Sequence, residues 1–534
     1  MLSVSNSLPV SNYSVKVVSE ANGSVFNPQT NSRVRLTLPS SLGMVDMHSS
    51  YLQFKLRVVP PVSSQAAAAG DRRDCYNMVM SNDQGAEQII KNLRVSIDNK
   101  PVEEIQNYNV LHKFKKDYSE DNAQKTLDSV FDKSIQKNDG SGYYCRSLVN
   151  GTPLATYNQP QKHIVKLGCS GVLSLPVGLP VLATGKVDIE FELEDADRVL
   201  ACATQHRDLV CDNGVTTGAG IFTSVDITPT DGGTRYDRLG FSSVDINTCP
   251  FAVGNTIRVV GNVAGGNNLD FHRLVTAVAI QGGKVRVSFA NSPAGGQNGA
   301  AVSNILLTAV IGRGVNGDNV GALNATQYSY EVSEVEYVVR SIEMPPPYLG
   351  SLQKRIQQNS FEMDIPTYTS YIDTIQPAIT KQTINVPAFS SRVKSVLSVP
   401  LFSAQVPYEF NRNGQLDTIR SFQAQIGTRR EPNRAIEMSN TSSTIHRYAS
   451  QEYLHELKKV LTANGIGLRS LKQHATNFVM CRSLSSMGGS EDLSDKGFRF
   501  DVEYNSNPRA KNVFSYVYHL KRLTITPAGL EIMG

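Results

Sequence analysis

The sequence predicts an all-β protein with short helices in its loops and a small β-barrel-like insertion. Runs of alternating apolar and polar residues recur along the chain, Gly (40) and Pro (24) separate them, and few segments have helical spacing. At 534 residues the chain is long for one core, and a guide of roughly 100–200 residues per domain suggests about three or four domains. Its 40% hydrophobic and 19% charged residues are typical of a folded protein.

Charge and cysteine content exclude several classes of function. The net charge of +4 comes from 52 basic and 48 acidic side chains, so no specific nucleic-acid binding is expected. The seven cysteines are scattered without a CxxC spacing, which predicts free thiols in a reducing compartment and no zinc or redox site. The first fifteen residues lack a basic region and an apolar stretch, and no run of about 18 apolar residues follows, so we expect no secretory signal and no transmembrane segment.

The first part of the chain alternates with a period of two. Residues 1–32 are rich in Ser, Asn and Val and predict an extended N-terminal arm. Residues 34–38 and 52–58 alternate apolar with polar or basic side chains, which predicts strands with one solvated face. Residues 93–105 predict a hairpin that turns at Asp98-Asn99-Lys100, followed by a short helix with one apolar face. That face comprises Val110, Leu111 and Phe114.

The clearest strand pattern lies at residues 187–194. Its apolar residues alternate with Asp188, Glu190, Glu192 and Glu194. Carboxylates in such a row are the ligands that a hard cation prefers, but no histidine or second acidic strand accompanies them. We therefore interpret them as one solvated strand face.

Residues 206–325 differ in composition from their surroundings. Gly, Asn and Thr are dense and Lys is almost absent, and strand patterns at 257–260 and 285–289 flank an apolar strand and a Gly282-Gly283 turn. This predicts a small closed β-barrel inserted into the larger fold. Gly312-Arg-Gly314-Val-Asn-Gly317 matches GxGxxG, but the helix that would complete a dinucleotide site does not follow. We interpret this match as a loop.

The order of elements in the back half of the chain is similar to that in the front half, and a proline-rich boundary separates the two. Residues 328–344 return to a strand pattern and end at Pro345-Pro346-Pro347, which predicts a stiff polyproline connector and an internal boundary. A helix is expected after Ser450 as N-cap, with Gly465 as C-cap. Its apolar face comprises Tyr453, Leu454, Leu457, Val460 and Leu461.

No catalytic signature stands out. HExxH, GxSxG and P-loop motifs are missing from the sequence, and His446 and His455 form the closest histidine pair. We expect His455 on the exposed or boundary face of its helix. Arg429, Arg430 and Arg434 are interpreted as a basic surface turn, with a phosphate contact as the alternative. The sequence therefore predicts no catalytic, cofactor-binding or metal-binding residues and no cofactor.

Several stretches resemble the double jelly-roll major capsid proteins of eukaryotic DNA viruses, of the polinton-like virus, virophage and nucleocytoplasmic large DNA virus type. The resemblance covers about residues 30–205 and 326–534 but not the insertion. The matching stretches are Ser50-Tyr-Leu-Gln-Phe54, Ile90-Lys-Asn-Leu-Arg-Val-Ser-Ile97, Glu104-Ile-Gln-Asn-Tyr-Asn109, Gln423-Ala-Gln-Ile-Gly427, Arg430-Glu-Pro432, the helix at 450–464, and Leu523-Thr-Ile-Thr526.

The resemblance implies two tandem jelly-roll β-sandwiches, each of two packed four-stranded sheets. It implies an arm at 1–32, a first jelly roll at 33–205 and 326–347, an inserted tower domain at 206–325, and a second jelly roll at 348–534. The implied function is structural and not enzymatic: homotrimeric, pseudo-hexameric capsomers that tile an icosahedral virus shell.

The implied partners are the chain itself, neighbouring capsomers, and minor capsid or penton proteins, with a host surface as a candidate partner of the 206–325 insertion. The implied location is the virion, after synthesis in the host cytoplasm. The alternatives are a minor capsid or vertex protein with related jelly rolls, or a β-sandwich enzyme or carbohydrate-binding protein.

Overall fold

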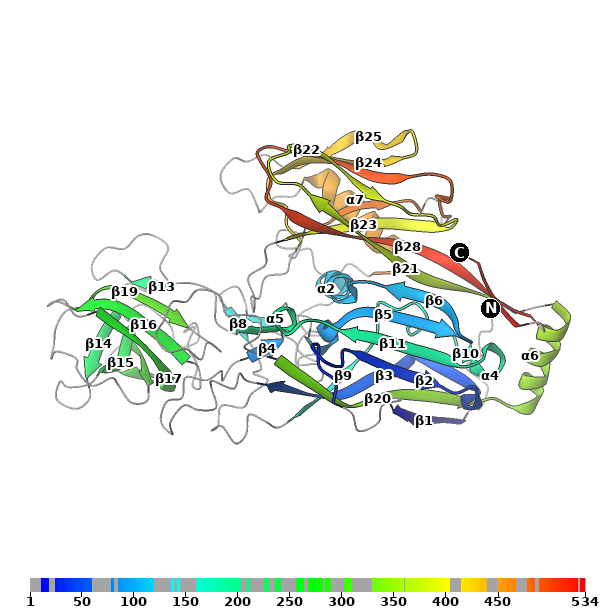
Figure 1. Ribbon diagram of the computed structural model, residues 1–534, viewed down its shortest axis with the longest axis horizontal. Coiled ribbons are helices and arrows are strands. Elements are labelled where there is room, and N and C mark those ends of the chain that lie inside the picture. The colour runs from blue at the N-terminus through cyan, green and yellow to red at the C-terminus, as the bar shows by residue number, and fades with distance from the viewer. Residues whose placement is uncertain are drawn as a thin grey trace.

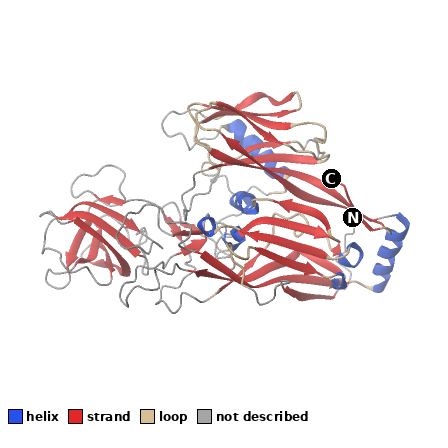
Figure 2. Cartoon of the chain, in the orientation of Figure 1, coloured by secondary structure: helices blue, strands red, loops and turns tan. Residues whose placement is uncertain are grey.

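Strands make up most of the part of the chain that the structure describes, and its helices are short and lie in the connections (Figure 2). The computed structural model describes residues 11–18, 25–59, 78–80, 85–119, 136–138, 142–144, 160–202, 209–211, 225–229, 236–241, 256–263, 268–281, 284–289, 302–309, 329–359, 361–403, 414–438, 450–466, 478–485, 489–526 and 529–533.

The first sandwich packs two sheets face to face (Figure 1). Its five-stranded sheet has the order β1 (Ser11–Val18), β20 (Ser329–Glu343), β3 (Met44–Val59) and β10 (Leu179–Pro180), with β9 (Gln161–Val165) also on β3. Facing it are β2 (Arg33–Leu38), β11 (Val187–Leu193), β5 (Ile90–Ile97) and β6 (Lys100–Ile105). The apolar residues of β2, namely Val34, Leu36 and Leu38, are fully buried, as their alternation predicts.

The second sandwich begins where the first one ends, because β6 pairs in parallel with β21 (Phe361–Ile375). The shared sheet continues through β28 (Lys511–Thr526), β23 (Val393–Phe402) and β26 (Met480–Ser483), and β29 (Gly529–Met533) pairs with β28. It thus has nine strands and belongs to both sandwiches. The opposite sheet of the second sandwich has the order β22 (Lys381–Val386), β27 (Phe498–Tyr504), β24 (Ile419–Ile426) and β25 (Arg429–Glu437).

The insertion forms a separate body at the end of the molecule opposite helix α6 (Pro346–Asn359) (Figure 1). Its seven strands are, in sheet order, β13 (Leu209–Cys211), β19 (Val302–Ala309), β16 (Thr256–Val263), β17 (Asn268–Gln281), β18 (Lys284–Phe289), β15 (Tyr236–Phe241) and β14 (Val225–Pro229). The predicted closed barrel is wrong for the strands that the structure describes. The end strands β13 and β14 each pair on one side only, so the sheet stays open.

The remaining described strands form two short two-stranded sheets. They pair β12 (Leu200–Cys202) with β4 (Met78–Met80), and β7 (Gln136–Asn138) with β8 (Gly142–Tyr144).

The predicted hairpin and the helix after it are confirmed. Asp98 and Asn99 both have positive φ, 50° and 62°, as a two-residue turn between twisted strands requires. Helix α2 (Tyr108–Ser119) follows and buries Leu111 and Phe114.

The second predicted helix, α7 (Gln451–Ala463), is also confirmed. Ser450 caps it by accepting the Tyr453 amide. The C-cap is Asn464, and Gly465 follows it with a positive φ of 68°.

The triple proline is not the predicted polyproline connector, because α6 begins at Pro346. Proline fits the first turn of a helix, where its missing N–H would have no intrahelical partner. The remaining helical segments are η1 (Ser40–Leu42), η2 (Gly85–Ile89), α4 (Val181–Thr184) and α5 (Ala196–Val199). Among the helices that the structure describes, none has both the length and the apolar character needed to span a membrane.

Candidate functional site

The acidic residues of β11 lie inside the shared sheet, between β2 and β5. Thr37 donates a hydrogen bond to the Asp188 carboxylate at 2.6 Å, and Lys186 lies 3.2 Å from it. Burial raises the pKa of Asp188, but Thr37, Lys186 and Arg35 outweigh this effect and hold it below its usual value.

Two other acids of this row also accept hydrogen bonds. Glu192 accepts a hydrogen bond from Asn92 at 2.7 Å, and Glu194 accepts one from Asn109 at 2.8 Å. A fully solvated face is therefore wrong for this strand, since Asp188 and Glu194 are buried. Within the described part of the chain, no group of three or more His, Cys, Asp or Glu side chains could hold a metal ion.

The basic residues near 430 lie in strand β25, just after a turn in which Gly427 has a φ of 56°. Arg429, Arg430 and Arg434 are exposed. Arg429 pairs with Glu431 at 2.7 Å and with Glu491 at 3.2 Å, so acidic neighbours offset the charge of this one arginine. His455 is exposed on α7, as predicted. His446 and the GxGxxG match at 312–317 lie outside the described residues.

One buried cluster contains a histidine, a glutamate, a tyrosine and a cysteine, which are side chains that take part in nucleophilic catalysis in enzymes. Nδ1 of His112 on α2 lies 3.1 Å from the Glu87 carboxylate. Tyr108 donates its hydroxyl to the same carboxylate, and the Cys169 backbone N–H donates to the Tyr108 oxygen at 3.3 Å. Burial lowers the pKa of His112, but the Glu87 carboxylate and the Cys169 thiol raise it to about 10.

Burial argues against catalysis by the cluster. Cys169 is 2% exposed, Glu87 5% and His112 9%, so a substrate has no access to these side chains. We therefore assign the cluster a role in holding α2 against η2 and the loop at 166–172.

The sequence did not predict this cluster. Glu87, His112 and Cys169 are far apart along the chain and fit no spacing rule. The available signal was the position of His112 four residues after Tyr108, which places both on one face of the helix. The rings of these two residues stack with 6.3 Å between their centroids.

A second histidine is buried in the uncharged state. His519 on β28 has hydroxyls on both sides of its ring, with Ser390 Oγ 2.9 Å from Nδ1 and Thr369 Oγ1 2.8 Å from Nε2. Burial lowers its pKa to about 4, and nearby Lys521 acts in the same direction. The ring thus joins strand β21 to the loop before β23.

The two sandwiches contact each other at a surface that we call the inter-sandwich junction. On one side it comprises β6, α2 and the loop at 166–172, and on the other side β21, β28 and β29. Four hydrogen bonds connect the two sides around the parallel pairing of Glu104 with Thr369. They run from the Gln106 amide to Ser370 Oγ, from Tyr516 to the Asn107 carbonyl, from Lys521 to the Val102 carbonyl, and from Lys100 to the Leu530 carbonyl.

The loop at 166–172 touches β21 through Gly171. A Cβ placed on Gly171 would lie 1.4 Å from the Pro366 carbonyl oxygen, so only glycine allows this approach. The buried Glu103 carboxylate fixes the loop by accepting the Gly171 amide at 2.7 Å and the Ser170 hydroxyl. Burial raises the pKa of Glu103, and these hydrogen bonds oppose the rise.

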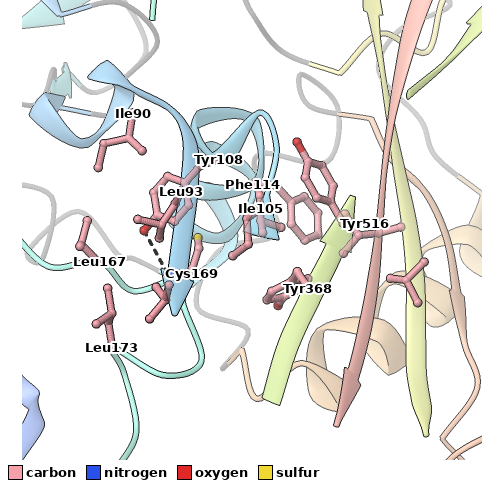
Figure 3. Close-up of a cluster of buried hydrophobic side chains, with 14 of the residues drawn as sticks. Ile90, Leu93, Ile105, Tyr108, Phe114, Leu167, Cys169, Leu173, Tyr368 and Tyr516 are labelled. Carbon is pink, nitrogen blue, oxygen red and sulfur yellow. Dashed lines mark hydrogen bonds between the residues drawn. The ribbon is translucent and has the colours of Figure 1, made fainter. Parts of the chain in front are cut away.

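Apolar side chains from both sandwiches fill the rest of the junction. Figure 3 shows Phe114 and Ile105 beside Tyr368 of β21 and Tyr516 of β28. All four are at most 3% exposed. The junction is therefore a continuous core that joins the two sandwiches side by side. Its chemistry is structural, because its polar groups bind one another and the backbone.

Comparison with known proteins gives structural likeness without sequence likeness. A scan against protein-family models and a search of curated proteins each found no match. The chain superimposes on the Faustovirus major capsid protein with a TM-score of 0.50, at 8% identity over 98% of this chain and 93% of that one.

Two further solved structures are similar over nearly the whole chain. One is the quasi-atomic model of the PBCV-1 virus capsid, with a TM-score of 0.48 at 10% identity over 99% of this chain and 98% of that one. The other is the cryo-EM structure of the Sputnik virophage, with a TM-score of 0.45 at 10% identity over 100% and 89%.

At 8% identity the likeness concerns the fold. The chain has an all-β architecture of two tandem jelly-roll sandwiches, as the sequence resemblance predicted.

Proposed function

We propose that this double jelly-roll chain is the major structural protein of a viral shell. The observation that carries the proposal is the shared nine-stranded sheet, which joins two sandwiches side by side in one subunit. Such a subunit presents two similar blocks, so three copies in a closed ring present six. The fold likeness to the Faustovirus major capsid protein supports the same function.

In this proposal the chain assembles as homotrimeric, pseudo-hexameric capsomers that tile an icosahedral shell. Near-neutral net charge, +4 on 534 residues, suits close packing of identical copies because self-repulsion is small. Neighbouring capsomers and minor capsid or penton proteins are the partners. The protein is synthesised in the host cytoplasm and resides in the virion.

The proposed division of the chain follows from the same function. Residues 1–32 are an arm, within which β1 pairs with β20. Residues 33–205 and 326–347 are the first block, and 348–534 the second. The insertion at 206–325 is an outward tower, supported by its position at the end of the molecule away from α6 (Figure 1), and a host surface is its proposed partner.

A non-enzymatic role agrees with the described side chains. The buried clusters at His112 and His519 are occupied by internal hydrogen bonds, and Arg429 of β25 has acidic neighbours. A carbohydrate-binding protein or enzyme built on β-sandwiches would instead be expected to remain monomeric.

Size-exclusion chromatography with light scattering tests the proposal on the full chain. We expect a particle of three 58.3-kDa chains, and negative-stain images should show a pseudo-hexagonal outline. A stable monomer at all concentrations would rule out the trimeric capsomer. A trimer present in purified virions only in low copy number would instead identify a minor capsid protein.

A further inference from the structure

Strand β1 lies at the edge of its sheet and is the first strand of the chain that the structure describes. It pairs with β20 over eight residues, from Ser11 opposite Glu343 to Val18 opposite Glu336. None of its described side chains is fully buried: Val15 and Val17 are half-buried, and Tyr13, Ser14, Lys16 and Val18 are exposed. Its attachment therefore comes from the ladder, from the packing of Val15 and Val17 against the core, and from the surface ion pair of Lys16 with Glu336, at 3.1 Å.

The same stretch carries unusual apolar exposure. Among the described residues, eight large apolar side chains are exposed, and three of them lie between residues 13 and 25: Tyr13 at 50%, Val18 at 39% and Val25 at 46%. Tyr13 and Val18 point to opposite faces of β1, because side chains alternate along a strand. A neighbouring copy that contacts either face would remove the cost of exposing the apolar side chain on that face. Strand β1 is also the edge strand of its sheet, and proteins usually cover such edges.

The residues of β20 that pair with β1 indicate that the partner is a second copy of this chain. Any second copy of this chain presents the same residues from Glu336 to Glu343, so β1 of one copy can form the same ladder and the same Lys16–Glu336 pair on another. Such an exchange keeps every contact of β1, and its cost is the loss of freedom on association. That cost is small when the copies are already neighbours in an assembly.

We propose that β1 is exchanged between adjacent copies in the assembled protein, with β1 of one chain adding to β20 of the next. This inference depends on the self-assembly proposed above. Residues 19–24 connect β1 to Val25 with the sequence Ser-Glu-Ala-Asn-Gly-Ser. Fully extended, the seven steps from Val18 to Val25 span about 25 Å, which limits the exchange to a directly contacting copy.

Paired single-cysteine chains test the exchange. Ser14 and Arg340 are register partners with exposed side chains, at a spacing that suits a disulfide. Full-length Ser14→Cys and Arg340→Cys chains are mixed, co-assembled, oxidised and run on a non-reducing gel. Since no chain holds both new thiols, only contact between chains can join them.

Two controls separate exchange from chance contact. Arg35→Cys and Glu190→Cys are register partners in β2 and β11, which are both internal to one sandwich, so their mixture should stay monomeric on the gel. Each single variant assembled alone reports disulfides made through native cysteines. We expect at least about tenfold more covalent dimer from the Ser14/Arg340 mixture than from either control.

The outcomes distinguish the two proposals. If particles form and the Ser14/Arg340 mixture gives no more dimer than the controls, exchange is refuted while self-assembly stands. If the chains stay monomeric in solution, both proposals fail. A chain carrying both cysteines adds a direct readout, because an intrachain link in assembled particles also refutes exchange, whereas linked multimers support it.

Discussion

Lys511 and Asp417 form an ion pair inside the second sandwich. Lys511 Nζ lies 2.6 Å from Asp417 Oδ2, and the lysine side chain is completely buried beside the rings of Phe402 and Tyr504. Burial lowers the pKa of Lys511, while Asp417 opposes that shift. Lys511 therefore stays in the core mainly because Asp417 is present, and Asp417 has Lys511 as its nearer cation and Arg509 as a second one at 3.8 Å.

We expect Lys511→Met to reduce the free energy of unfolding by about 1–3 kcal/mol, because it leaves the buried Asp417 carboxylate with only the more distant Arg509 guanidinium, at 3.8 Å, as a cation. Urea unfolding followed by circular dichroism measures the change. Lys381→Met is the matched control, since Lys381 is 78% exposed in its pair with Glu503, and it should change stability by less than about 0.5 kcal/mol. Equal effects of the two variants would contradict the importance assigned to the buried pair.

The neutral His519 makes stability depend on pH. Its pKa is about 4 in the folded protein, against an ordinary value of 6.5. Between these values the unfolded chain binds a proton that the folded chain does not, so stability falls as the pH falls from about 7 to 4. The full loss is roughly 3 kcal/mol. His112 acts in the opposite sense, because its pKa of about 10 is raised from the ordinary 6.5. Its contribution to stability is complete below about pH 6 and is lost as the pH rises from there toward 10, so it does not produce the loss at acid pH.

His519→Gln should flatten the acid side of the stability profile, because its amide can bond both hydroxyls without titrating. The measurement is the urea midpoint at several pH values between 7.5 and 4.5. His455→Gln is the control, since His455 is exposed on α7 and its loss should leave the profile parallel to that of the unmodified protein. A parallel profile for His519→Gln as well would show that His519 does not titrate as proposed.

Helix α7 offers a test at the scale of one element. The Ser450 side chain accepts the Tyr453 amide at 3.2 Å and so satisfies one of the free N–H groups of the first turn. Ser450→Ala should lower stability by about 1 kcal/mol, whereas Ser450→Asp should retain it because a carboxylate caps equally well. Thermal melts of the three proteins decide this, and an unchanged melting temperature for Ser450→Ala would show that the cap contributes nothing.

The elements that the sequence predicted correctly are those fixed by local chemistry. The hairpin at 93–105 needs residues that tolerate positive φ, and Asp98 and Asn99 do so. Helix α7 has a cap residue and an apolar face that coincide. The triple proline was misread because Pro346 suits both a polyproline segment and a first helical turn, and the residues after it decide between them.

The predictions that failed, or were missing, depend on residues distant in sequence. The acids of the strand at 187–194 were expected to be solvated. Asp188 is instead buried and accepts a hydrogen bond from Thr37 of β2, which is 151 residues away in the sequence. The His112 cluster needs Glu87 and Cys169, which no spacing rule connects. Closure of the insertion depends on how its end strands pair, which the alternation of each strand does not specify.

At the scale of the whole molecule, the side-by-side placement of the two sandwiches is the feature that sequence patterns alone do not determine. The similarity of the two halves predicts two blocks but says nothing of the angle or contact between them. That relation comes from the junction, where the pairing of Glu104 with Thr369 extends one sheet into the next. The junction is also where a small change should have a large effect.

Gly171→Ala tests whether the junction makes the two sandwiches one unit. The added Cβ would lie 1.4 Å from the Pro366 carbonyl oxygen, a backbone atom that no side-chain rotation can move aside. The loop at 166–172 must then leave β21, which weakens the Glu103 bonds that hold it. We expect a loss of at least about 1–3 kcal/mol, the usual range for overpacking, and calorimetry should resolve separate transitions for the two sandwiches.

Gly168→Ala is the matched control in the same loop, because its Cβ would meet nothing within 4 Å. It should unfold like the unmodified protein. If Gly171→Ala also keeps a single transition at an unchanged temperature, the sandwiches do not depend on this contact for their coupling. If instead the transitions separate and the variant forms fewer trimers, rigid alignment of the two blocks is a condition for the proposed assembly, since each block must meet a different neighbour in the ring.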